Sequence, residues 1–269
     1  MKLNWFYEQN PLWVVVILAL AMILADEVGY QLGCRRSAKA DEAAKDHFNA
    51  IRTSLLGLLA LLLAFSFGMT AQRYDARRQL VIEDAIQLRA LYLRTTVLAD
   101  PRRAQLKRLL REYIDGRADT NLMQQVLTRR AAADLVARSE GIHARMWELV
   151  KSMGEQEALA GQAEELRKLL INVVSVHDKR VEAYLSRVPA PVIWLLMVSA
   201  VTTMMAVGFS GGLSRHRGML ARALFTLLVC ATILVVLELD RPEQGLLQVD
   251  QSPMIRLKQT VDQEAGAGA

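Results

Sequence analysis

Cysteine is scarce in this sequence, and histidine is scattered. The 269 residues contain only Cys34 and Cys230, neither of them in a CxxC pair, and four histidines of which no two have the spacing of metal ligands on one helix face. Closely spaced cysteine and histidine residues are typical of zinc sites, and patterned cysteines are typical of disulfide frameworks. The sequence therefore predicts neither kind of site, and we expect no cofactor.

Proline and aromatic residues are also few. The chain has six prolines and an aromatic content of 6%, which is poor material for a β-rich fold. Ala, Leu, Arg, Glu and Gln, which favour helices, dominate the long stretch between the apolar segments. The composition predicts an all-α protein.

Charge is missing from four long stretches. Across the whole chain the composition looks ordinary, with 52% hydrophobic and 23% charged residues, but the apolar residues are segregated. Because a bilayer core about 30 Å thick takes roughly 17–25 helical residues to cross, the stretches predict membrane-spanning helices. The uncharged stretches are 11–25, 53–72, 188–214 and 223–237. The predicted spans, which include flanking residues, are about 12–32, 51–71, 191–210 and 219–239.

The order of the spans predicts an integral membrane protein with two hairpins flanking a helical soluble domain. Apolar residues recur at three- and four-residue spacing after the second span, so its helix is expected to continue to about residue 98. Each hairpin crosses and returns, which places the domain and both termini on one side of the membrane. The predicted regions are hairpin 1 at 1–72, the domain at 73–188, hairpin 2 at 189–240, and a tail at 241–269 with a disordered Ala-Gly end.

Two groups of charged residues lie near the ends of the spans. Asp26, Glu27, Arg52 and Arg222 lie at the loop ends. Ionisable groups are costly in lipid and tend to pair, so one hypothesis is that Glu27 forms an ion pair with Arg52 or Arg222. The alternative is that all four side chains lie at the level of the lipid headgroups.

At the domain side of the membrane, charged residues follow the second and fourth spans. Asp75 and Arg78 follow the second, and Asp240 and Arg241 follow the fourth. They are a candidate charged collar that joins the hairpins. The alternative is ordinary pairing on helix surfaces.

Positive charge is concentrated after the second span. Residues 73–111 carry ten basic and four acidic side chains, a net charge of +6, against +5 for the whole chain. This stretch could attract anionic lipid headgroups or act as a funnel for anions, and the alternative is a solvated helix face. No motif supports nucleic-acid binding, so no nucleic-acid partner is expected.

Reactive groups form no catalytic arrangement in the sequence. His177 and Asp178 are adjacent, but neighbouring helix positions do not face each other. There is no phosphate-binding glycine loop, metal motif or pair of catalytic carboxylates, so we do not expect an enzyme. Gly57, Ala60 and Ala64 share one face of the second span and predict close helix packing, within the bundle or between subunits.

Motifs along most of the chain resemble one known family. They include DARRQL at 75–80, LYLR at 91–94, VHDKRV at 176–181 and LDRP at 239–242. Further matching positions are 62–67, Glu83, 109–113, 187–189, Gly245 and Val249, with 27–30 and Gly33 near the start. Together, over about residues 10–260, they resemble the bacterial membrane-protein family that is catalogued as a domain of unknown function and labelled bestrophin-like.

The resemblance implies an analogy to bestrophins, which are pentameric anion channels with two membrane hairpins around a cytosolic helical domain. The basic residues near the span ends number eight on each side, so this analogy, and not the positive-inside rule, places the domain in the cytosol. Bestrophins bind calcium through an acidic run after the fourth span. Here only Glu238, Asp240 and Glu243 fall in that place, interrupted by Arg241 and Pro242, so calcium gating is not expected.

A pore follows from the same resemblance. In bestrophins an apolar neck lies on the second span, and here Leu58, Leu62, Phe65 and Met69 share a face of that span. We therefore expect a homo-oligomer in the bacterial inner membrane, in contact with anionic lipids, that acts as an anion channel. The alternative is a non-conducting scaffold or sensor that presents its helical domain to partners.

Overall fold

The computed structural model describes residues 10–37, 41–118, 129–240 and 248–267. The chain forms two compact units, one of Met1–Arg73 with Arg187–Leu247, and one of Tyr74–Ser186 with Gln248–Ala269. We call them the membrane unit and the helical unit. Every regular element in the described ranges is a helix, so the all-α prediction is confirmed.

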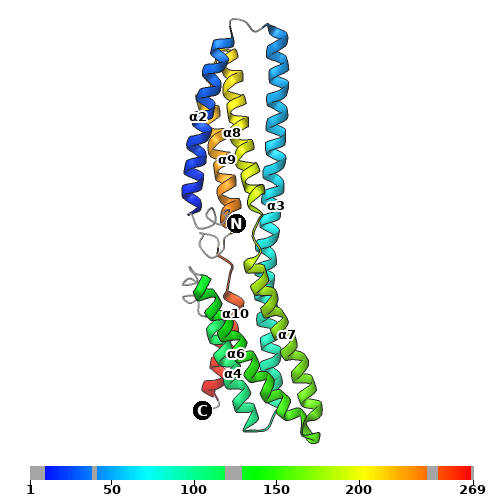
Figure 1. The fold of residues 1–269 in the computed structure, drawn as a ribbon. Helices are drawn as coiled ribbons and strands as arrows, with labels where there is room; N and C mark the ends of the chain where they lie inside the picture. Colours follow the sequence, from blue (N-terminus) through cyan, green and yellow to red (C-terminus); the bar gives the residue numbers. More distant parts are fainter. Residues whose placement is uncertain (1–9, 38–40, 119–128, 241–247, 268–269) are drawn as a thin grey trace. The chain divides into compact units, whose positions relative to one another are not determined.

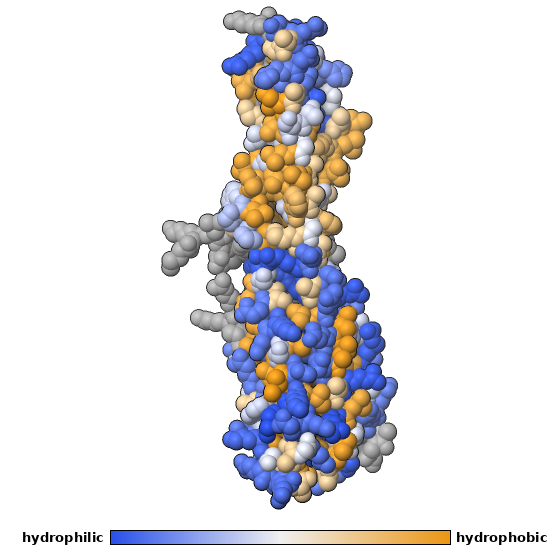
Figure 2. Space-filling view, turned by 90° about the vertical axis from the view of Figure 1, so that its right-hand side faces the viewer, coloured by the Kyte–Doolittle hydropathy of each residue, from blue (hydrophilic) through white to orange (hydrophobic). Residues whose placement is uncertain are grey.

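The membrane unit contains the four predicted spans. They lie in α2 (Pro11–Ser37), the first part of α3 (Glu42–Arg94), α8 (Ala190–Leu213) and α9 (Met219–Asp240) (Figure 1). All four of these helices are long and apolar enough to cross a membrane. Their inner faces form one core, which includes Leu18, Met22, Leu59, Ala200, Ile233 and Leu237. Figure 2 shows that the visible face of this unit is largely hydrophobic, with hydrophilic residues gathered at one end.

Helices α2 and α8 pack unusually closely, because glycines face each other where they cross. A methyl group on Gly29 would overlap the carbonyl oxygen of Met205, and one on Gly208 would overlap the carbonyl oxygen of Asp26. Gly33 and Gly212 repeat the pattern one turn further along, so each helix carries small residues four apart. This contact holds the first span against the third.

The helical unit has its own core, formed by helices with amphipathic sequences. Its elements are the rest of α3, η1 (Thr95–Val97), α4 (Arg102–Ala118), α6 (Arg129–Gly154), η2 (Glu157–Leu159), α7 (Ala160–Leu185) and α10 (Ser252–Ala267). Apolar side chains spaced along one face of α4 and of α6, such as Leu106, Leu110 and Met146, are fully buried. The expected continuation of the second span is confirmed, since α3 runs without a break to Arg94.

Two segments differ from the sequence prediction. Helix α3 begins at Glu42, nine residues before the predicted start of the second span, and the carboxylate of Asp41 caps it by accepting a hydrogen bond from the Ala44 N–H at 2.9 Å. The predicted tail instead contains α10, which packs on α4. The buried stripe of α10 consists of Met254, Leu257 and Val261. Because this apolar spacing favours an amphipathic helix, α10 forms despite the alanine and glycine residues at its end.

Candidate functional site

The candidate pore face on α3 is only partly exposed. Leu58 and Phe65 have 50% and 68% of their surface exposed, whereas Leu62 and Met69 pack against the core of the membrane unit. The exposed stripe instead continues through Leu61. Two of the four predicted positions are thus exposed and two face the core of the unit, because leucine occupies both sides of this helix, and their place in a pore stays a prediction.

The small residues of α3 lie on its outer side. A Cβ atom on Gly57 would meet nothing within 4 Å, so this residue is not used to pack helices within the chain. Ala60 and Ala64 line a shallow groove of about 350 Å³ beside Phe225 and Val229 of α9. The sequence predicts that this face packs either within the bundle or between subunits. For Gly57, packing between subunits is the alternative that is still open.

Charged residues at the loop end of the membrane unit form pairs, but with a different arrangement from the hypothesis. Arg222 Nη1 lies 3.2 Å from Asp26 Oδ2, and both side chains are largely buried. Glu27, for which Arg52 or Arg222 was expected, instead pairs with Arg217 at 3.3 Å on the surface. The Tyr30 ring lies against both arginines, with centroid distances of 4.6 Å to Arg217 and 5.4 Å to Arg222.

Arg52 has a polar partner on another helix. Its Nη1 donates to the Ser210 hydroxyl at 2.9 Å, and that hydroxyl donates to Asn49 Oδ1 at 2.8 Å. This chain of hydrogen bonds joins α3 to α8. Asn49 and Ser210 were not identified from the sequence. The one feature of the sequence that points to them is that each is a polar residue next to or within an apolar span.

The four residues of the predicted charged collar are divided between the units. Asp75 accepts a hydrogen bond from Gln79 of its own helix, and Arg78 is exposed. Asp240 is buried and accepts the Val188 backbone N–H at 2.9 Å, which ties the end of α9 to the start of the third span. Arg241 and Glu243 lie outside the described residues. The collar therefore stays a prediction.

A buried ionic network lies at the centre of the helical unit. Asp84 of α3 is completely buried, and its Oδ2 accepts hydrogen bonds from Arg180 of α7 and, at 3.0 Å, from Arg117 of α4. Arg180 also reaches Gln251 at 3.5 Å. Three helices thus meet on one carboxylate oxygen. The sequence signal for this network is Asp84 itself, which occupies an inward position between the buried Val81 and Leu88.

Two buried histidines adjoin this network. Tyr113 Oη lies 3.2 Å from His177 Nδ1, and the rings of His143 and His177 meet edge to face with centroids 5.0 Å apart. Burial and the nearby Arg117 charge lower the pKa of His143 to about 4 and that of His177 to about 3. Burial also raises the pKa of Tyr113. Both imidazoles are therefore neutral at pH 7.

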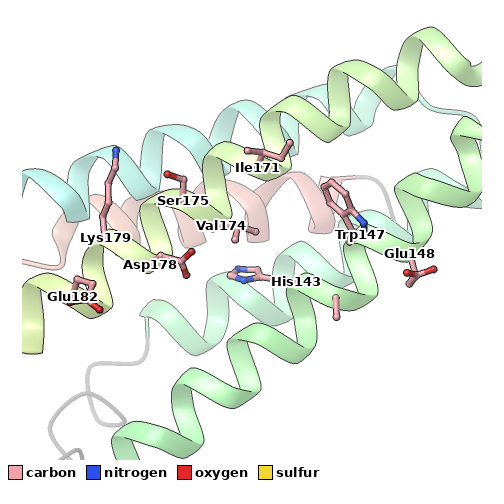
Figure 3. Close-up of a pocket in the computed structure, with 10 residues that line it drawn as sticks. His143, Trp147, Glu148, Ile171, Val174, Ser175, Asp178, Lys179 and Glu182 are labelled. Atoms are coloured by element: carbon pink, nitrogen blue, oxygen red, sulfur yellow. The ribbon is translucent and has the colours of Figure 1, made fainter.

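An open groove runs along α6 and α7 on the outer side of His143 (Figure 3). It has a volume of about 780 Å³ and is lined by apolar and acidic side chains together with His143, Ser175 and Lys179. Trp147 and Ile171 are partly exposed in it, and Asp178 lies on its wall. His177 points into the core while Asp178 is exposed, as the helix geometry predicted.

The described residues offer no arrangement suited to a metal ion. Within them, no three His, Cys, Asp or Glu side chains are grouped to hold one, and Cys34 and Cys230 are free thiols. What the molecule does offer is an apolar membrane unit with an outward-facing stripe on α3, and a helical unit with a buried cationic centre. These features define an all-α membrane protein with a helical domain outside the membrane.

Comparison with known proteins gives the family. A sequence model described as the bestrophin-like domain matches residues 21–254, and the chain therefore belongs to the bestrophin-like family. The crystal structure of a mutant of a bacterial bestrophin homologue from Klebsiella pneumoniae is similar in fold, with a TM-score of 0.65 and 11% sequence identity. The similarity covers 95% of this chain and 98% of that one. No curated protein matches the chain.

Proposed function

We propose that this protein is a homo-oligomeric anion channel of the bacterial inner membrane. The observation that carries the proposal is membership of the bestrophin-like family together with a fold similarity to a bacterial bestrophin homologue over nearly the whole chain. Since that similarity is at 11% identity, the activity has to be argued from this chain's own residues.

The exposed stripe of α3 is the part of the chain best suited to line a pore. Leu58, Leu61 and Phe65 project away from the core of their own unit. In an oligomer these side chains would face the same residues of neighbouring copies around a central axis, and Gly57 would allow close approach. An apolar constriction of this kind gates by dewetting and leaves ion selection to charged groups elsewhere.

Basic residues supply the charge that anions need. Arg78, Arg89 and Arg256 surround a hollow of about 340 Å³ on the helical unit, which Asp250 also lines. Arg78 and Arg89 belong to the basic stretch of residues 73–111. Exposed arginines raise the local concentration of anions. We further propose that the helical unit lies in the cytoplasm and that basic residues near the spans bind anionic lipids. We propose neither a catalytic role nor a nucleic-acid partner for this protein.

Reconstitution of the purified protein in liposomes tests the proposal. We expect chloride or nitrate flux from an oligomer, and a change of at least several-fold in that flux when Phe65 is replaced in Phe65→Ala. The matched control is Leu227→Ala, which alters an equally exposed apolar side chain on α9. A wild-type oligomer that passes neither anion would refute the channel.

The groove on α6 and α7 favours one second candidate, a non-conducting scaffold or sensor. Trp147 and Ile171 leave apolar surface exposed on a unit that stands outside the membrane. In the channel this groove would contact a neighbouring copy, and in the scaffold it would bind another protein. Trp147→Glu therefore distinguishes the two, because it lowers the oligomeric state in the first case and leaves it unchanged in the second.

A further inference from the structure

The buried network of the helical unit has more hydrogen-bond donors than acceptors. Among the described residues, the Nε atoms of Arg117 and Arg180 and the Nε2 atoms of His143 and His177 are buried without a hydrogen-bond partner. The Tyr113 hydroxyl donates to His177 Nδ1 when the imidazole proton is on Nε2, which leaves that N–H as a donor. Asp84 Oδ1 is the one carboxylate oxygen of the network that is buried without a partner, and His143 Nε2 donates or accepts according to its tautomer.

The formal charge of the network is positive. Arg117 and Arg180 together carry two positive charges, Asp84 carries one negative charge, and the two histidines are neutral at pH 7. One positive charge is thus in excess and largely buried among four helices, and Asp84 is the one carboxylate hydrogen-bonded to either arginine in the described residues. A buried charge in this state is costly unless an anion accompanies it.

A small cavity adjoins two of these residues, Arg117 and His177. It has a volume of about 70 Å³, and its wall includes Tyr113, Arg117, Ile142 and His177. The side chain of His177 lines this cavity, is only 1% exposed, and has no hydrogen-bond partner at Nε2. Since roughly 10–15 Å³ of such volume holds one water molecule, the cavity has room for a small inorganic anion together with a few water molecules. Glu112 also lines it, with its carboxylate bound to Arg145 at 2.9 Å.

We propose that this cavity is a binding site for a small monovalent inorganic anion of the size of chloride, held by the Arg117 guanidinium and the His177 N–H. An anion there accepts hydrogen bonds from Arg117 and His177 and balances the positive charge of the network. Water molecules would accept hydrogen bonds from these donors, but they would not neutralise the excess positive charge. Because α4, α6 and α7 all contribute to the wall, a bound anion stabilises the packing of the helical unit. The site lies outside the membrane unit and does not depend on the proposed channel activity.

Bromide gives the direct test on the wild-type protein. Bromide replaces chloride in such sites, and its anomalous scattering locates it in crystals of the full chain. We expect a bromide peak between Arg117 and His177. Density there that has no anomalous signal, as water gives, would overturn the proposal whether or not the protein conducts ions.

Thermal unfolding gives a second test in solution. Replacing gluconate by chloride at constant ionic strength is expected to raise the Tm of the wild-type protein by several degrees, because a ligand that binds only the folded state stabilises it. The increase should disappear in Arg117→Gln, return in part in Arg117→Lys, and persist in the control Arg103→Gln, which alters an exposed arginine paired with Asp100. An equal chloride effect in folded Arg117→Gln would also overturn the proposal. If that variant does not fold, the bromide experiment decides.

Discussion

Single residues in the helical unit combine burial with charge in a way that makes their removal costly. Asp84 is the common acceptor for Arg180 and Arg117, and no other residue in the described chain accepts from both. Replacing both members of a buried ion pair can leave the stability nearly unchanged. Removing one member is destabilising, because the other charge stays in a low-dielectric interior without a partner. The stability of this unit is therefore expected to depend strongly on Asp84.

Asp84→Asn is expected to destabilise the protein strongly. The substitution leaves two buried guanidinium groups without a carboxylate, at a cost of about 3–5 kcal/mol. The measurement is the free energy of unfolding in detergent. Glu83→Gln is the matched control, since Glu83 is exposed and pairs with Lys179 at 3.8 Å, and surface pairs of this kind contribute about 0–1 kcal/mol. Equal effects of the two variants would contradict the assigned role of Asp84.

The two buried histidines predict a stability that depends on pH. Their folded-state pKa values of about 4 and about 3 lie below the ordinary value of 6.5, so the unfolded chain binds protons first as pH falls. Stability is thus fully present above pH 6.5 and decreases below it by about 1.4 kcal/mol per pH unit for each histidine, until the folded pKa is reached. Unfolding midpoints between pH 7.5 and pH 5 measure this.

Substitution of these histidines separates their effect from general acid denaturation. In a folded His143→Gln variant the decrease in stability between pH 7.5 and pH 5 should be smaller, because one titrating group has been removed. The control is His47→Gln, which changes an exposed histidine and should leave the pH dependence unaltered. An unchanged pH dependence in both variants would mean that the buried pair does not control the acid response.

At the scale of elements, the glycine crossing of α2 and α8 sets the geometry of the membrane unit. Helices that associate in lipid gain little from burying apolar surface, so close backbone contact between small residues takes its place. The sequence contains this pattern at Gly29 and Gly33, and at Gly208 and Gly212. Sequence reasoning noticed small residues only on α3, where the glycine has an open Cβ position.

Gly208→Ala is expected to weaken the membrane unit. Its methyl group would overlap the Asp26 carbonyl oxygen, so the two helices must move apart, at a cost of about 1–3 kcal/mol. Gly141→Ala is the control, because a Cβ atom there meets nothing within 4 Å and alanine favours a helix more than glycine does. We expect a lower Tm for the first variant and an equal or higher Tm for the second. A tolerated Gly208→Ala would indicate that the crossing is looser than described.

At the scale of the whole molecule, the proposed topology predicts the accessibility of two positions. In a chain with Cys34→Ser and Cys230→Ser, Arg215→Cys lies in the loop between α8 and α9, and Glu155→Cys lies between α6 and α7. A membrane-impermeant thiol reagent added to intact cells should label Arg215→Cys and leave Glu155→Cys unlabelled until the cells are opened. The reverse pattern would place the helical unit outside the cytoplasm.

Much of the architecture could be predicted from sequence, because membrane spans and amphipathic stripes are periodic signals along the chain. The four spans, the long α3 and the buried faces of α4 and α6 all follow from such signals. The partners of charged residues could not be predicted. Asp26, and not Glu27, meets Arg222, and Arg117 meets Asp84 from a different helix, because these pairings depend on how helices rotate about their axes in the folded bundle.

The contact between α2 and α8 also has a consequence for biosynthesis. Its two sides are separated by more than 150 residues, since α2 ends at Ser37 and α8 begins at Ala190. At about 5–20 residues per second, a ribosome needs roughly 8–30 s to make the intervening chain. During that time the first span is in the bilayer with its glycine surface uncovered. The membrane unit can therefore assemble only after the helical unit has been synthesised, and the nascent first hairpin is the stage most open to chaperones or to wrong partners.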